Sequence, residues 1–127
     1  MKIEREKIDV ETAYRCLKNY ILSRQKVDFV DVENLFNIIG FRFKGKIKLQ
    51  PSKNQSVLIW DEWNKDAIEV LKKLLSDGFT LEKIAAIHYN FFKCYISKLP
   101  VASSAHEQYD EMHWLPMVIK PGKNNAN

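Results

Sequence analysis

Residues 41–49, Phe-Arg-Phe-Lys-Gly-Lys-Ile-Lys-Leu, alternate between a cation and an apolar residue or glycine. A period of two is typical of a half-buried strand, which turns its apolar residues to one face and its cations to the other. Residues 51–56 are polar and turn-forming, and the apolar run at 57–60 predicts a returning strand. The sequence therefore predicts a β-hairpin with one apolar and one basic face.

Apolar residues at three- and four-residue spacing predict helices on both sides of this hairpin. The expected helices cover residues 9–25, 31–39 and 64–77. Asp9 and Asn64 are N-cap residues for the first and third, Asp31 starts the second, and Gly40 ends it. The predicted fold class is α+β.

Residues 79–99 fit two patterns. Helical spacing runs through them, but aromatic and β-branched residues dominate and favour strands, with arms at 89–92 and 95–99. We expect strands here, and a helix stays open as the alternative. Residues 114–119 form a short apolar segment that Pro116 restricts to an edge strand or to an extended segment packed against the core.

The length of 127 residues suits one domain. We expect a single compact domain over residues 1–119. The order of helix and then hairpin recurs in its second half, which indicates possible sub-units at 9–63 and 64–119. Residues 120–127 have nothing to bury and are expected to form a flexible tail.

The positive charge is concentrated in the hairpin. The formal net charge is +4, yet residues 34–60 contain no acidic side chain. The cations of this stretch are Arg42, Lys44, Lys46, Lys48 and Lys53. Alternate strand residues lie about 6.6–7 Å apart, a spacing that can follow a phosphate backbone. The same cations would also prevent an exposed edge strand from pairing with other chains, or could contact an acidic protein surface.

Several classes of protein are excluded by composition. No apolar run approaches the roughly 20 residues that span a bilayer, and the N-terminus is too charged for a signal peptide. Cys16 and Cys94 cannot form a disulfide framework, so we expect buried free thiols and a cytoplasmic protein. The glycines are isolated and form no phosphate-binding loop, so neither an enzyme nor a cofactor is predicted.

The order of helix, helix and basic hairpin over residues 9–60 resembles part of a winged helix-turn-helix domain. The resemblance implies that residues 32–39 are the recognition helix and that residues 41–60 are the wing, which contacts the DNA backbone. The whole chain also looks like small proteins of bacterial mobile elements. That likeness is carried by Leu-Pro-Val-Ala at 99–102 and His-Trp-Leu-Pro at 113–116.

The implied recognition helix offers Asn34 and Asn37 to base edges, but no arginine or lysine. Asp31 and Glu33 stand at its start, where carboxylates repel phosphates. We therefore expect the hairpin, rather than this helix, to make most contacts with nucleic acid.

His106, Asp110 and His113 are the candidate metal ligands, because neutral imidazole and carboxylate both bind zinc. The spacing lacks the histidine pair at i and i+4 of a helical zinc site, and a solvated polar loop is the simpler interpretation. His88 falls on an apolar stripe and is expected to be a core histidine rather than a catalytic base.

Trp60, Trp63 and Trp114 have the flat rings that stack on bases. Trp60 follows an apolar run and is expected in the core, and Trp63 is expected to pack against the helix that follows it.

The function that these patterns favour is nucleic-acid binding, to duplex DNA, through phosphate contacts of the hairpin. The alternative is a protein–protein adaptor or a homodimer on the same kind of scaffold, with no nucleic-acid binding. The fold does not decide between these two functions, since one scaffold can host both.

Overall fold

Each of the three α-helices in the described part of the chain begins at a side-chain cap, and in two of them the cap is the residue that the sequence predicts. The structure is a computed structural model that describes residues 7–123. α1 (Val10–Arg24) follows Asp9, whose carboxylate accepts the Thr12 N–H at 2.8 Å. α3 (Lys65–Ser76) follows Asn64, whose side chain accepts the Ala67 N–H at 2.8 Å. The predictions of these two helices are confirmed.

The second helix, α2 (Phe29–Ile39), begins two residues earlier than predicted. Asp28 and not Asp31 is its N-cap, because the two carboxylates form a capping box: Asp28 accepts the Asp31 N–H at 2.9 Å, and Asp31 accepts the Asp28 N–H at 3.0 Å. Gly40 ends the helix with φ 79°, as a C-cap glycine does.

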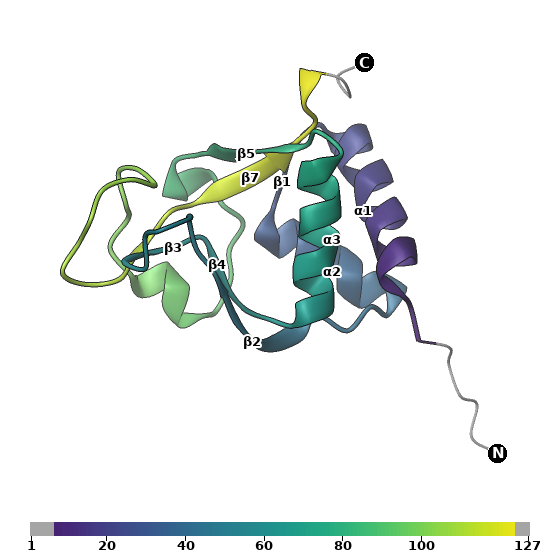
Figure 1. Cartoon of the computed structure of the whole chain (residues 1–127), viewed down its shortest axis with the longest axis horizontal. Coiled ribbons are helices and arrows are strands. Elements are labelled where there is room, and N and C mark those ends of the chain that lie inside the picture. Colours follow the sequence, from purple (N-terminus) through teal and green to yellow (C-terminus); the bar gives the residue numbers. More distant parts are fainter. Residues whose placement is uncertain (1–6, 124–127) are drawn as a thin grey trace.

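Three short strands form an antiparallel sheet in the order β1-β7-β5. They are β1 (Val27–Asp28), β5 (Thr80–Lys83) and β7 (Met117–Lys120). The last of them, β7, lies in the centre (Figure 1), so the prediction of an edge strand over 114–119 is wrong. Pro116 stands just before β7, where its missing N–H is not needed by the sheet, and its carbonyl accepts the Ile84 N–H at 3.0 Å.

The predicted tail begins too early. Lys120 belongs to β7 and is paired with Thr80. Residues 124–127 of that prediction lie outside the described residues. The hairpin predicted after the third helix is also absent. β5, which follows α3, pairs with β7 and not with the segment that comes next in the sequence.

The hairpin is present, but its strands differ from those predicted. β2 (Lys44–Leu49) pairs with β4 (Trp60–Trp63), while β3 (Val57–Leu58) turns away to pair in parallel with β6 (His113–Trp114). Trp63 faces both Lys44 and Ile47, so the register of β2 shifts between these two residues, and it shifts again between Ile47 and Leu49. A Cβ at Gly45 would lie 2.6 Å from the Trp63 carbonyl oxygen, which explains why glycine allows this approach. The regular alternation is thereby broken, and Ile47 of the predicted apolar face is 40% exposed.

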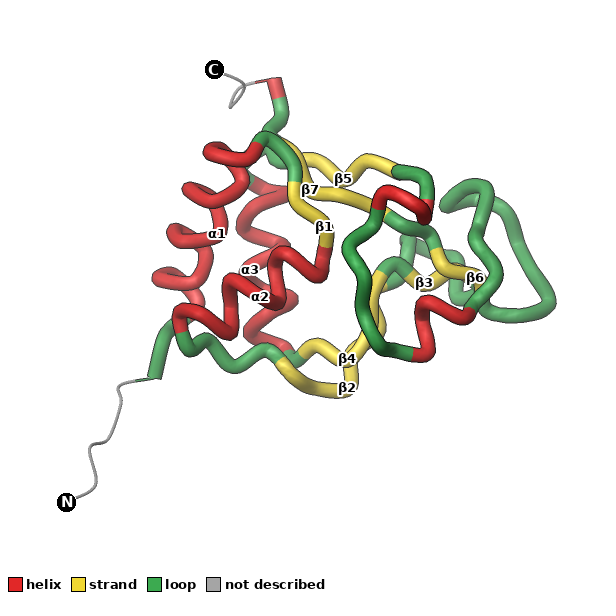
Figure 2. Tube along the Cα trace, turned by 180° about the vertical axis from the view of Figure 1, so that it is seen from behind, coloured by secondary structure: helices red, strands yellow, loops and turns green. Residues whose placement is uncertain are grey.

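The segment between β5 and β6 contains no hairpin, so the predicted arms at 89–92 and 95–99 are wrong. It holds two short 3-10 turns, η1 (Ala86–His88) and η2 (Tyr95–Lys98). Of its aromatic side chains, Tyr89 is buried and Phe92 packs against the core, whereas Phe91 is exposed. In both Figure 1 and Figure 2 this segment lies at the opposite end of the molecule from α1. His88 is exposed, which corrects its prediction as a core histidine.

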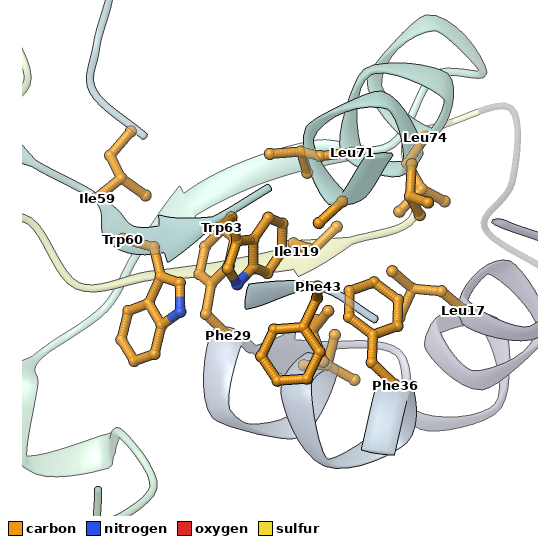
Figure 3. Packing of buried hydrophobic residues seen from close by; sticks show 14 of the residues in the cluster. Leu17, Phe29, Phe36, Phe43, Ile59, Trp60, Trp63, Leu71, Leu74 and Ile119 are labelled. Atoms are coloured by element: carbon orange, nitrogen blue, oxygen red, sulfur yellow. The ribbon is translucent and has the colours of Figure 1, made fainter. Parts of the chain in front are cut away.

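The core is built from the inward faces of all three helices, the hairpin and β7. Figure 3 shows Trp60 and Trp63 beside Phe29, with ring centroids 5.8 and 5.5 Å from it. Phe36 continues the aromatic row toward Phe43. Among residues 7–123, no helix has the length and apolar character needed to cross a membrane.

Candidate functional site

The cations of the hairpin fall into two groups in the structure. Lys48 is engaged: its ammonium lies 2.8 Å from Asp61 Oδ2 and 3.1 Å from the Tyr95 hydroxyl. Lys44 is loosely paired, 3.8 Å from Glu33 Oε1 and 67% exposed. The two acids that border the acid-free stretch in the sequence therefore fold back onto two of its lysines.

The remaining hairpin cations are Arg42, Lys46 and Lys53, and all three are exposed. None of them has an ion-pair partner among residues 7–123. These three charges are the uncompensated part of the basic surface that the sequence predicts.

A groove runs along the outer face of α2. It consists of two adjoining cavities of about 460 and 550 Å³ that share Glu33, Asn37 and Lys44. The first cavity extends to Asn34, Asp61, Glu62 and residues 91–96, and the second extends to residues 40–43. We call the two cavities together the α2 groove.

The α2 groove brings together predicted site residues from two separate elements. Asn34 and Asn37 of α2 meet Lys44 of the hairpin in the first cavity, and Arg42 joins them in the second. Asn34 and Asn37 are exposed, and within residues 7–123 their side-chain amides form no hydrogen bond, so they are available to a ligand. Lys46, Lys48 and Lys53 do not line the groove.

Glu33 has a structural role that sequence reasoning missed. Its Oε2 accepts the indole N–H groups of Trp60 at 2.7 Å and Trp63 at 2.9 Å. The carboxylate thus fixes both rings in the core and faces Lys44 with its other oxygen. Two indole N–H groups and the Lys44 ammonium face this carboxylate and offset its negative charge. It therefore repels a phosphate less strongly than a free carboxylate at the start of the helix would.

Asp61, Lys48 and Tyr95 form a second polar cluster at the rim of the groove. Burial raises the pKa of the Asp61 carboxyl, but hydrogen bonds from Lys48, Tyr95 and the Glu62 N–H outweigh it, and the net pKa is lowered. Burial and the hydrogen bond to Asp61 raise the pKa of Tyr95, and the Asp61 hydrogen bond raises that of Lys48. Each shift favours the form that the group has at neutral pH: a charged Asp61, a charged Lys48 and a neutral Tyr95. None of the three is therefore poised to exchange a proton near neutral pH, and the role of the cluster is to join η2 to the hairpin.

The aromatic side of the groove comes from the loop after η1. Phe91 is 84% exposed and Tyr95 is 43% exposed. The density of aromatic residues at 89–95 was visible in the sequence, but their alternation between core and surface depends on contacts with distant elements. Sequence reasoning therefore found the amide and cationic parts of the groove and missed the aromatic part.

The three tryptophans are buried, with 4% exposure for Trp60, 2% for Trp63 and 3% for Trp114. The prediction of Trp60 in the core is confirmed, and none of the three rings has a face open to a base. Cys16 and Cys94 are free and only half-buried.

The candidate metal ligands do not converge. His106 and Asp110 are exposed, and the His113 ring stacks on Tyr109 with centroids 3.7 Å apart. Within residues 7–123, no group of three or more histidine, cysteine, aspartate or glutamate side chains is placed to hold a metal ion.

Within residues 7–123, three α-helices and several small sheets define a mixed α+β protein. No protein-family model, curated protein or solved structure matches the chain. The geometry of the α2 groove is therefore the basis for assigning a function.

Proposed function

We propose that this chain binds nucleic acid through the α2 groove and the cations beside it. One observation carries the proposal: Asn34 and Asn37 from a helix and Arg42 and Lys44 from a hairpin line one groove. Amides and cations together suit nucleic acid, because amides pair with base edges while cations neutralise phosphates.

The charges around the groove support an anionic ligand. Arg42 and Lys46 are exposed and unpaired among the described residues, whereas Glu33 and Asp61 are already held by internal donors. Glu62 is an exposed carboxylate with no ion-pair partner in the described chain, and it sits on the side of the groove toward Asp61. Phosphates are therefore expected at the Arg42 end.

We also propose that the helices and the three-stranded sheet form a winged-helix scaffold. The order α1, β1, α2, α3, β5 and β7, with β7 between β1 and β5, is consistent with that fold. This assignment differs from the one that the sequence resemblance implies. Here α3, and not the helix at 32–39, takes the recognition-helix position, and residues 84–116, not residues 41–60, take the position of the wing. The hairpin is then an insertion between α2 and α3. Lys72 and Lys73 of α3 are already paired with acids, so the α2 groove is the better-supported contact surface.

Fluorescence anisotropy of labelled single-stranded and duplex DNA at low and moderate salt tests the proposal. The hairpin variant is Arg42→Glu/Lys46→Glu, and the matched control is Lys65→Glu/Lys72→Glu on α3, which changes the net charge equally. We expect wild-type affinity to fall steeply with salt, the hairpin variant to lose binding, and the α3 variant to keep it.

The outcomes that contradict the proposal are equally definite. If wild type binds neither DNA form at low salt, the chain is not a nucleic-acid-binding protein. If both charge variants lose affinity equally, or if the α3 variant alone loses it, the hairpin and the α2 groove are not the contact surface.

Two exposed apolar side chains favour a second candidate function, contact with another protein or a second copy of this chain. Ile38 of α2 is 81% exposed and Phe91 is 84% exposed. Sedimentation of wild type and Ile38→Ser over a range of concentrations tests self-association. A mass that rises with concentration in wild type alone would support it, and a monomer at all concentrations would exclude a homodimer.

A further inference from the structure

We propose that the α2 groove holds a single strand of nucleic acid, with one unpaired base stacked on the ring of Phe91. The inference rests on the proposed function and specifies which form of nucleic acid the groove takes. Proteins that bind single strands combine a cationic groove for the backbone with aromatic side chains on which bases stack. Both parts are present here, at opposite ends of one groove.

Phe91 is exposed on a backbone that is held firmly on both sides. The Tyr89 hydroxyl accepts the Phe29 N–H at 3.0 Å, and the Asn90 N–H donates to Asp28 at 2.8 Å. On the other side, the Phe92 ring packs 5.0 Å from that of Trp60. These contacts hold the backbone on both sides of Phe91, so less backbone freedom is lost when a base stacks on its ring.

The polar side chains of the groove fit the other parts of a nucleotide. The amides of Asn34 and Asn37, which have no internal partner within the described residues, can bond to the edge of a base that stacks nearby. Lys93 lines the same cavity and has no ion-pair partner in the described chain. Lys44 and Arg42 continue the cationic path toward the second cavity, where the backbone of the strand would leave.

The size of the groove and the position of Phe91 favour a single strand over a duplex. Cavities of about 460 and 550 Å³ are in the range of small-ligand sites. A duplex stacks its base faces against one another, so it offers no face to an exposed ring unless a base is first unpaired, which costs a few kcal/mol. A single strand offers those faces freely.

Anisotropy with a labelled single-stranded oligonucleotide, and with the duplex formed from its complement, tests the inference. The variant is Phe91→Ala. The matched control is Ile87→Ala, because Ile87 is 87% exposed in η1, just before the loop that carries Phe91, and does not line the groove. Stacking is worth about 1–3 kcal/mol per base, so Phe91→Ala should weaken single-strand binding about five- to hundredfold, and Ile87→Ala should not.

A third variant, Phe91→Trp, gives a direct signal. The natural tryptophans are at most 4% exposed, so an indole at position 91 would dominate the solvent-accessible emission. We expect Phe91→Trp to keep affinity for the single strand and to be quenched when the oligonucleotide binds. Equal melting temperatures of the three variants and wild type confirm that folding is unchanged.

Failure of this inference is distinguishable from failure of the proposed function. If Phe91→Ala binds the single strand as tightly as Ile87→Ala does, while Arg42→Glu/Lys46→Glu does not bind, the stacking site is wrong and nucleic-acid binding stands. Tighter binding of duplex than of single strand overturns the inference in the same way. If wild type binds neither form, both the inference and the proposed function fall.

Discussion

Replacing Glu33 by alanine is predicted to destabilise the fold through the two tryptophans that its carboxylate holds. Trp60 and Trp63 are 4% and 2% exposed, and their indole N–H groups donate to Glu33 Oε2 at 2.7 and 2.9 Å. A buried donor without an acceptor costs about 1–3 kcal/mol, so two such donors cost about 2–6 kcal/mol. Glu33 lines the groove, so water can reach part of the space that its side chain leaves, and we expect the lower half of this range.

The loss of the Lys44 contact adds little to this sum. That pair is 3.8 Å long and its lysine is 67% exposed, a geometry worth less than about 1 kcal/mol. Glu33→Gln keeps an oxygen acceptor and removes the charge, so about half of the hydrogen-bond strength should remain. Its expected cost is therefore smaller than that of Glu33→Ala, about 1–2 kcal/mol.

Urea unfolding followed by circular dichroism measures these costs. The matched control is Glu69→Ala, since Glu69 is also a helical glutamate with a lysine neighbour, Lys72, but on an exposed surface. The control should lose no more than about 0.5 kcal/mol. If Glu33→Ala is as stable as Glu69→Ala, the carboxylate does not hold the indoles and the description of this core is wrong.

Three further changes test other parts of the fold by the same unfolding measurement. Gly45→Ala should cost about 1–3 kcal/mol, because the added Cβ would lie 2.6 Å from the Trp63 carbonyl oxygen; an unchanged midpoint would contradict the close approach of these strands. Phe36→Ala should cost about 3–5 kcal/mol, since Phe36 is fully buried; a loss below about 1 kcal/mol would show that it is not a core residue. The pKa of Asp61 is lowered in the folded state, so its contribution is present above the ordinary aspartate pKa and disappears as pH falls through the folded value. The free energy of unfolding of Asp61→Asn should therefore fall less than that of wild type below about pH 4. An equally steep fall in both proteins would show that the Asp61 carboxylate does not stabilise the fold.

The helices were predictable from the sequence because their signals are local. Asp9 and Asn64 cap α1 and α3 from within three residues, and each apolar stripe repeats within one element. The start of α2 was misplaced because two aspartates compete for the cap position, and only the reciprocal hydrogen bonds of Asp28 and Asp31 select the first of them.

The strand pairings and half of the site were not predictable, because they depend on contacts between distant parts of the chain. Pro116 in an apolar run indicates an edge strand, yet the proline stands outside β7, which is central. The number of unpaired cations in the hairpin was also overestimated, because acids outside the basic stretch were not counted as partners. Glu33 and Asp61 border the basic stretch along the chain but contact Lys44 and Lys48 in space.

The central position of β7 has a consequence for synthesis of the protein on the ribosome. β1 and β5 leave the ribosome with their neighbour still missing, because β7 lies at Met117–Lys120 and both pair with it. The sheet therefore closes by a contact that spans about ninety residues, from Val27 to Ile119. Until then two unpaired strand edges and the apolar faces beneath them are open to other chains, so a nascent chain arrested before residue 117 should be a target for chaperones.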